Sequence, residues 1–273
     1  MARHGGPPGL LFGKVYGQTF ALLGARGRVL FPLALVIGAA PIIGLNLGAT
    51  SLMHGARWTL TYWGVRAGGQ IITLYLFGLL AIATVHIVLS SAQAGRQLLV
   101  ETGAMIAPRL VPLALVVAIY QSPALLTLLS TLPNALPGAG YRFYGLQILA
   151  GPIVFCLGLV RTLWVGASMP VFAEEPLGVF AVLRRAAALL AGRRWSFLKV
   201  YAPVVVFSLV TNGGLNFIAR FFGRSLIGQD LIVISAAIYA VTAMFSAVFF
   251  AVCYRELRLM KDGSAKEIAD VFE

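Results

Sequence analysis

One arginine lies inside a long apolar stretch, where a charge needs a specific reason. Arg161 follows FCLGLV, and TLWVGASMPVFA continues the apolar sequence for 12 residues beyond it. On a single helix this places the guanidinium ~18 Å from the helix end. An arginine at the bilayer centre costs ~3 kcal/mol on insertion scales, so it is usually paired or faces a cavity. Arg161 is a candidate either for a structural anchor or ion pair, or for contact with a lipid or an anionic substrate.

A histidine forms the second candidate site. His86 shares an apolar stretch with Gln70, Ser90, Ser91 and Gln93. If another polar group faced it, it could relay a proton or hold a ligand; otherwise it is a hydrogen-bonded packing residue. The apolar stretches contain no internal Asp or Glu. This argues against a transporter coupled to protons or sodium, whose coupling site usually needs a carboxylate.

Other chemistry has no support in the sequence. It contains no His/Asp/Glu cluster with metal-ligand spacing, no GxSxG and no GxxxxGK[ST]. Cys156 and Cys253 fall at different depths of the expected membrane domain, which argues against a disulfide or a shared metal. We therefore predict a protein that is not an enzyme, with no catalytic residues, no metal site and no cofactor.

The composition indicates that lipid, not water, surrounds most of the chain. Hydrophobic residues make up 59% of the sequence, charged residues 11%, and the mean hydropathy is +0.89. The net charge of +12 does not indicate nucleic-acid binding, because the basic residues lie between apolar stretches.

About 20 apolar residues cross a bilayer as a helix. Six stretches qualify: 29–53, 67–95, a third from Leu110 to before the turn-rich 133–140, 143–173, 195–219 and 231–254.

The distribution of Lys and Arg predicts the orientation of these spans. With a cytoplasmic N-terminus, the tail, the second and fourth loops and the C-terminal tail carry 15 basic residues, and the opposite side carries 5. We predict a bacterial inner-membrane protein with both termini in the cytoplasm. Its parts are an N-terminal amphipathic segment (1–28), a six-helix domain (29–254) and a C-terminal tail (255–273).

Three further segments have the pattern of helices that lie on the membrane. In 177–192, apolar residues can face acyl chains while Arg184 and Arg185 reach head groups, and Arg193 and Arg194 follow directly. Segments 10–23 and, more weakly, 94–108 are similar. Their starts are spaced by 84 and 83 residues, which suggests a threefold unit of interfacial helix plus hairpin. Small residues at packing spacing, Gly44 and Gly48, and then Ala243, Ala247 and Ala251, predict helix contacts.

The second half of the chain resembles a known family. An in-span arginine, a proline before an acidic residue, and a basic amphipathic helix ending in a glycine-basic-aromatic step correspond to Arg161, Pro170, Glu174 and 184–195. The closing YRELRLMKDG at 254–263 is also similar. This pattern resembles the glycerophosphoryl diester phosphodiesterase membrane-domain family. The resemblance implies a six-helix membrane domain, and since the soluble phosphodiesterase domain is missing, it implies no hydrolysis.

The sequence therefore predicts an all-helical membrane protein with about six transmembrane helices and two or three interfacial helices. The preferred function is binding of anionic lipid through Arg184, Arg185, Arg193 and Arg194, or service as a membrane-organising or accessory subunit with a protein partner or a second copy of itself. The alternative is a transporter or channel for a small or lipidic anion that uses Arg161. A membrane enzyme acting on lipid would need a polar site around His86.

Overall fold

The computed structural model is helical, and the residues that it describes contain no β-strand, which confirms the predicted all-helical class. It describes residues 10–52, 60–90, 96–120, 122, 144–222 and 228–272. Within these ranges no side chain is described at 46, 48–52, 60–63, 65–66, 96, 144–151, 212–222, 228–232 and 264–272.

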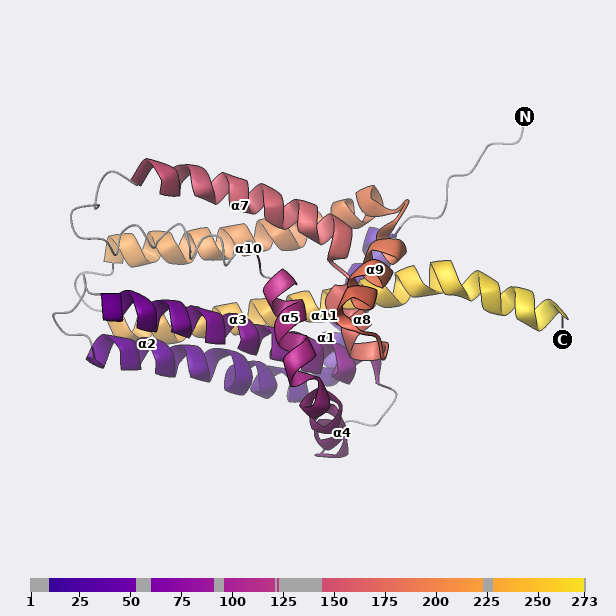
Figure 1. The fold of residues 1–273 in the computed structure, drawn as a ribbon, viewed down its shortest axis with the longest axis horizontal. Coiled ribbons are helices and arrows are strands. Elements are labelled where there is room, and N and C mark those ends of the chain that lie inside the picture. The colour runs from indigo at the N-terminus through magenta and orange to yellow at the C-terminus, as the bar shows by residue number, and fades with distance from the viewer. Residues whose placement is uncertain are drawn as a thin grey trace.

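The described residues form a series of helices in chain order. Their bounds are α1 (Phe12–Leu33), the π-helical segment η1 (Ala34–Ala39), α2 (Ala40–Leu52), α3 (Leu60–Leu89), α4 (Arg96–Ile106), the 3-10 turn η2 (Ala107–Arg109), α5 (Leu110–Tyr120), α7 (Tyr144–Val165), α8 (Ser168–Glu174), α9 (Val179–Leu190), α10 (Arg194–Phe222) and α11 (Gly228–Phe272). Helices α2, α3, α7, α10 and α11 run side by side along the long axis (Figure 1).

The two ends of this bundle differ in composition. We call one end the basic end: it contains α8, α9, the start of α10 and residues 254–262 of α11 (Figure 1). The start of α1 lies there too, since Lys14 pairs with Glu256 of α11. The C-terminal ends of α2 and α10 and the N-terminal ends of α3, α7 and α11 lie at the other end (Figure 1).

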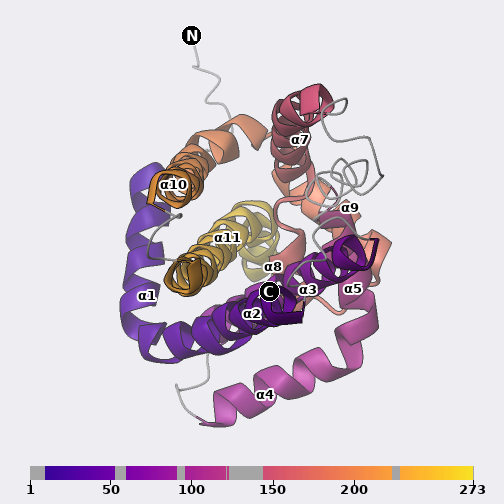
Figure 2. The same cartoon turned by 90° about the vertical axis from the view of Figure 1, so that its left-hand side faces the viewer.

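Helix α11 is the centre of the fold. It contacts α1, η1, α2, α3, α8, α9 and α10, and it lies inside the ring that the other helices form (Figure 2). Every side chain from Val248 to Tyr254 is buried, so this part of α11 has no exposed face. A helix that is apolar all round lies either in a protein core or in a membrane, and this part of α11 lies in the core. The predicted sixth span is therefore a core helix as well as an apolar one.

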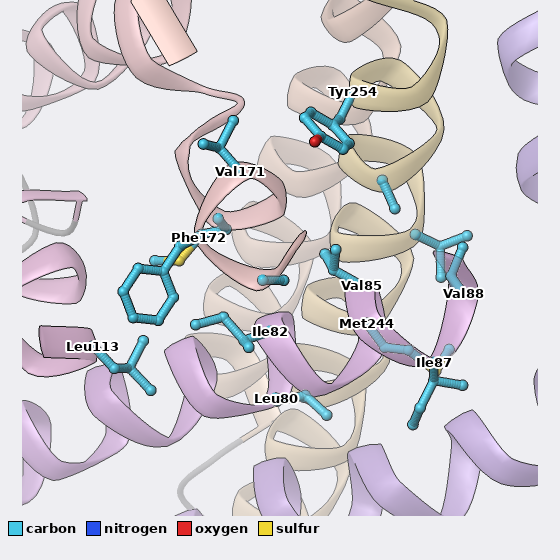
Figure 3. Close-up of a cluster of buried hydrophobic side chains, with 14 of the residues drawn as sticks. Leu80, Ile82, Val85, Ile87, Val88, Leu113, Val171, Phe172, Met244 and Tyr254 are labelled. Carbon is cyan, nitrogen blue, oxygen red and sulfur yellow. The ribbon is translucent and has the colours of Figure 1, made fainter. Parts of the chain in front are cut away.

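Near the basic end, the core joins α3, α8 and α11. Figure 3 shows Val171 and Phe172 of the short α8 within this cluster, with Phe172 beside Leu113 of α5 and Ile82 of α3. Both α8 side chains are almost fully buried. The packing holds α8, and with it the acidic residues that follow, against the ends of α3 and α11.

The first helix curves around the bundle before it joins the axial helices. Figure 2 shows α1 along one side and α2 continuing across to α3. Pro32 lies near the C-terminal end of α1, two residues before η1. Proline supplies no N–H and its ring crowds the carbonyl four residues earlier, so a local change of helical pitch is expected there.

A close approach of η1 to α11 depends on Gly38. A Cβ at that position would lie 2.8 Å from the Cβ of Ala240 and 3.2 Å from Leu80. Glycine is therefore needed for the two backbones to come this close. The predicted contact at Gly44 is wrong, because a Cβ there would meet none of the described atoms within 4 Å.

By contrast, the contacts predicted for the small residues of α11 are present. Ala247 and Ala251 are buried, and Ala243 packs against the core as predicted. Gly48 lies outside the residues whose surroundings the structure describes. Small residues thus do mark contacts of α11, but the first span makes its contact six residues before the predicted position.

Five of the described helical stretches are long and apolar enough to cross a membrane: Phe12–Leu45, Ala67–Leu89, Gln97–Tyr120, Pro152–Glu174 and Val233–Gly263. This is the pattern of a multi-pass membrane protein. The predicted span 195–219 lies in α10 but is not among the five. Within the described side chains of α10, Arg194 and Lys199 occupy the first two turns and shorten its apolar part. The count of six spans stays a prediction.

The described residues of the segments predicted to lie on the membrane are mostly helical. Segment 94–108 is mostly α4, which meets α5 at an angle through η2 (Figure 2). Segment 10–23 begins α1, where Leu11, Phe12 and Phe20 are exposed while Val15 is buried. This first segment runs into its span without a break. The threefold unit therefore stays a prediction.

The third segment, 177–192, is the separate helix α9. It ends before Gly192, whose φ of +77° is the left-handed conformation that glycine adopts readily. Val182, Ala186 and Leu189 are buried against the protein, and Phe180 is exposed. Much of the apolar face that was expected to meet acyl chains thus meets other helices instead.

The C-terminal region continues α11. This helix has 45 residues, which is ~68 Å at helical rise and more than twice a bilayer core of ~30 Å. The expected tail 255–273 is therefore helical as far as Phe272, and it projects beyond the other helices (Figure 1).

Replacing Gly38 by leucine should destabilise the protein, because the new side chain overlaps Ala240 and Leu80. Overpacking a core of this kind costs about 1–3 kcal/mol. Gly44→Leu is the matched control, since it places the same side chain in open space. Thermal unfolding in detergent, followed by tryptophan fluorescence, should show a lower Tm for Gly38→Leu only. Equal Tm values for the two variants would contradict the close approach of η1 to α11.

Candidate functional site

The short helix α8 brings two carboxylates to the basic end. All six side chains from Ser168 to Ala173 are buried, and Glu174 and Glu175 follow them. The turn before α8 needs Gly166, because a Cβ there would overlap the carbonyl oxygen of Thr162. Pro176 comes next and cannot continue a helix. The acidic pair is therefore fixed where α8 ends.

Cations at this end hold the carbonyl groups of helix C-termini. Arg109 Nη1 donates to the carbonyl oxygens of Phe172 (2.9 Å) and Ala173 (3.5 Å), in the last turn of α8. Arg26 Nη2 donates to the carbonyl oxygen of Ser90, directly after α3. These carbonyl groups have no partner within their own helix, and the helix dipole makes them a favourable place for a positive charge.

Lys261 continues the same pattern on α9. Its Nζ donates to the carbonyl oxygen of Ala188 over 2.7 Å, in the last turn of that helix. The ammonium group thus ties α11 to α9, and like Arg109 and Arg26 it compensates a helix C-terminus. A cation with such a partner is a structural link more than a ligand site.

A second set of contacts, which we call the carboxylate network, consists of Glu175, Arg185, Tyr254, Arg258 and Asp262. Arg185 Nη2 lies 2.6 Å from Asp262 Oδ2, and Arg185 Nε lies 3.3 Å from Glu175 Oε1. The hydroxyl of Tyr254 donates to the same Glu175 oxygen over 2.9 Å. Arg258 Nε reaches Asp262 at 3.7 Å. The network fastens α8 and α9 to α11.

The network also keeps Arg185 charged. Burial disfavours its charge, but hydrogen bonds to Asp262 and Glu175 and the negative charges of both groups outweigh burial, so the pKa of Arg185 is raised. Its donors face carboxylates of the protein itself. Of the four arginines predicted to bind lipid, Arg185 thus already has carboxylate partners within the protein.

His86 does face another polar group. Its Nδ1 lies 3.8 Å from Glu174 Oε1, across the contact between α3 and α8. Both side chains are about three-quarters buried. The partner comes from a distant part of the chain, so the pair joins the end of the predicted second span to the end of the fourth.

A buried carboxylate ties α1 to α11. Glu256 is 4% exposed and lies 2.6 Å from Lys14 Nζ, and Gln18 Nε2 donates to its other oxygen over 3.3 Å. Tyr16 adds a hydrogen bond from its hydroxyl to the carbonyl oxygen of Val200 on α10. The amphipathic start of α1 is thus held both by these polar contacts and by the buried Val15, while Phe12 and Phe20 stay exposed.

Arg161 is half-buried on α7 and has partners in the protein. Its Nη1 donates to the carbonyl oxygen of Tyr120, the last residue of α5, and its guanidinium carbon lies 4.3 Å from the centre of the Tyr120 ring. Nη2 reaches Thr162 Oγ1 at 3.4 Å. The Nε of Arg161 is buried and has no hydrogen-bond partner among the described residues.

Three predicted arginines lie outside the carboxylate network. Arg184 is exposed on α9. Arg193 and Arg194 are partly buried at the turn into α10, and within the described part of the chain neither Nε finds a hydrogen-bond partner. The guanidinium carbon of Arg194 lies 3.9 Å from the centre of a Trp164 ring, a cation–π contact between α10 and α7.

The structure thus separates residues that the sequence grouped together. Arg185 joins a protein network, Arg161 joins α5, and Arg184, Arg193 and Arg194 stay at the outside. The sequence analysis missed the carboxylates Glu175, Glu256 and Asp262 as partners. A usable signal was present: acidic residues are few, Glu175 and Glu256 lie within two residues of the end of an apolar stretch, and Glu256 and Asp262 lie among basic residues.

Comparison with known proteins does not add to this picture. No protein-family model, curated protein or solved structure matches the chain. Among the described residues, no group of three or more His, Cys, Asp or Glu side chains could hold a metal ion.

Removing the charge of Arg185 should destabilise the protein, because Arg185→Gln leaves Glu175 and Asp262 without their shared cation. About 1–2 kcal/mol is expected for a charge-assisted pair that is partly exposed. Arg184→Gln, one residue away and exposed, is the matched control and should leave Tm unchanged. Thermal unfolding in detergent checks both. Equal stability of the two variants would show that the carboxylate network does not hold α9 in place.

Proposed function

We propose that this chain is a non-catalytic integral protein of a bacterial inner membrane that binds anionic phospholipid at its basic end. It serves as a membrane-organising or accessory subunit, together with a protein partner or a second copy of itself. No nucleic acid is involved in this function. The proposal rests on the membrane-compatible helices and on the side chains exposed at the basic end.

One observation carries the proposal: exposed cations lie one helical turn from exposed aromatic residues. Phe180 and Arg184 are both exposed and lie four residues apart on α9, and Trp195 and Lys199 have the same relation on α10. Side chains four apart share one face of a helix. A surface that mixes large apolar groups with cations suits the boundary between acyl chains and anionic head groups.

The orientation follows from the same charges. The basic end collects the start of α1 and residues 254–262 of α11 with the arginines of α9 and of the start of α10 (Figure 1). Cytoplasmic segments carry the excess of Lys and Arg in inner-membrane proteins. We therefore assign the basic end and both termini to the cytoplasmic side, where the anionic lipids attract basic residues.

The family resemblance fits this proposal. Pro170 lies within the buried α8, Glu174 faces His86, and Arg161 holds the end of α5. These residues lie in the membrane domain, and on the sequence pattern that they form we propose the glycerophosphoryl diester phosphodiesterase membrane-domain family as a relative. Membership would imply no hydrolytic activity for this chain.

The proposal predicts that Arg184→Gln, Arg193→Gln and Arg194→Gln, made together, lower the anionic lipid that co-purifies. Each basic residue near an anionic leaflet contributes ~1 kcal/mol, so the loss should be large in a triple variant. Arg185 is kept, because its charge belongs to the carboxylate network. Lipid mass spectrometry of the purified protein measures the ratio of phosphatidylglycerol and cardiolipin to neutral or zwitterionic lipid.

The matched control is Arg66→Gln with Arg220→Gln, at the N-terminal part of α3 and the C-terminal part of α10, away from the basic end. It removes two arginines at the opposite end and should leave the lipid ratio unchanged. Unchanged lipid in the triple variant, or no excess of anionic lipid in the wild type, would contradict the proposed function.

A second candidate function is transport of a small or lipidic anion past Arg161. The observation in its favour is the buried Nε of Arg161, which lacks a hydrogen-bond partner in the described structure. Against it, the other donors of Arg161 contact Tyr120 and Thr162, as a structural anchor would.

Thiol labelling separates the two functions. In a background without Cys156 and Cys253, Arg161→Cys should react slowly with a charged aqueous reagent in membranes, because lipid binding needs no aqueous path to this position. Arg184→Cys, exposed at the basic end, is the control and should react fast. Fast labelling at 161 in a variant that elutes normally from a sizing column would favour the transporter.

A further inference from the structure

Helix α7 carries an exposed apolar stripe that leads to the basic end. Ile153, Leu157, Val160 and Trp164 are 57%, 44%, 53% and 52% exposed, and their spacing of four, three and four residues places them on one face. At helical rise the stripe is ~16 Å long. That is about half of a hydrocarbon core of ~30 Å, or one leaflet.

At the basic end, the stripe ends beside a cationic side chain. The guanidinium of Arg194 stacks on Trp164, the last residue of the stripe, and Arg193 precedes it. Figures 1 and 2 show α7 at the edge of the bundle, with the start of α10 reaching toward it. The turn that carries these arginines passes through Gly192 in its left-handed conformation, which fixes where they lie.

Arg193 and Arg194 also differ from the paired cations of the basic end. Arg185 contacts two carboxylates, and Arg109 and Arg26 contact carbonyl groups. The described residues provide no carboxylate within ion-pair distance of Arg193 or Arg194, and their Nε groups are buried without an acceptor. Two adjacent cations beside one leaflet's length of apolar surface therefore lack an anion.

The geometry points to a binding site for one anionic phospholipid: its phosphate meets Arg193 and Arg194, and an acyl chain lies along Ile153, Leu157 and Val160 to Trp164. The inference rests on the proposed function and narrows it to one location. An anionic lipid fits better than a zwitterionic one, because the amine of a zwitterionic head group would bring a cation toward two arginines. The lipid comes from the leaflet at the basic end, since the stripe ends there beside Arg193 and Arg194.

The site can be tested with Trp164 as a reporter. Trp58, Trp63 and Trp195 are replaced by phenylalanine, and the protein is placed in phosphatidylcholine nanodiscs that contain brominated phosphatidylglycerol or, in a parallel series, brominated phosphatidylcholine. Bromine on an acyl chain quenches a tryptophan that it touches. Phosphatidylglycerol should quench Trp164 at lower mole fraction, with a relative affinity of about fivefold for each of the two arginines.

Arg193→Gln with Arg194→Gln should remove this preference, and Arg66→Gln with Arg220→Gln, at the opposite end of the bundle, is the control that should retain it. If the Gln variant fails to fold, Arg194→Lys tests the site instead: it keeps the charge and loses the flat stack on Trp164, so the preference should fall without disappearing. Equal quenching by the two lipids would overturn the inference. Absence of quenching by either would do the same, since a protein partner would then cover the stripe.

Failure of the inference can be told from failure of the proposed function. If the purified wild type carries excess anionic lipid that the triple glutamine variant loses, while Trp164 shows no preference, the lipid binds elsewhere on the basic end. If the wild type carries no such excess, the proposed function fails as well.

Discussion

Compensation of positive charge at one end of the bundle is the interaction on which the rest of the structure depends. Apolar helices have no strong hydrophobic reason to associate within lipid, so polar contacts and close packing must hold them. Here Arg26, Arg109 and Lys261 bond to the last carbonyl groups of α3, α8 and α9. Arg185 meets the carboxylates of Glu175 and Asp262. These contacts gather the helix ends around α11, whose residues Val248 to Tyr254 are buried on all sides.

This compensation divides the arginines into two classes with different consequences. Those that contact carbonyl or carboxylate groups of the protein are cross-links, and losing one leaves its partner unsatisfied. Those at the outside, Arg184, Arg193 and Arg194, keep donors for something else. The short helix α8 makes the division possible, because it places Glu174 beside His86 of α3 and Glu175 beside Arg185 of α9. Among the described residues, the α9–α10 turn has no carboxylate partner.

The arginines at the outside matter for lipid binding because of where they lie along the bundle. Trp164 ends an apolar stripe on α7, and Arg194 lies over its ring. Phe180 and Arg184 repeat the pairing of an apolar group with a cation on α9. An amphipathic surface of this kind suits the depth at which acyl chains meet head groups. Lipid contact and helix packing thus use different faces of the same end of the molecule.

The sequence by itself determined the helical class, the apolar stretches, the three segments that precede them and the concentration of cations, because length, hydropathy and charge are local properties. Only the tertiary structure decided which charges meet. Glu174 is 88 residues from His86, and Asp262 is 77 from Arg185, so no local pattern relates them. The tertiary structure also shows that the close contact of the first span is at Gly38 and not at the predicted Gly44. The curve of α1 and η1 sets which face of the helix meets α11. Periodicity identifies a face of a helix, but the neighbour of that face depends on how the whole chain packs.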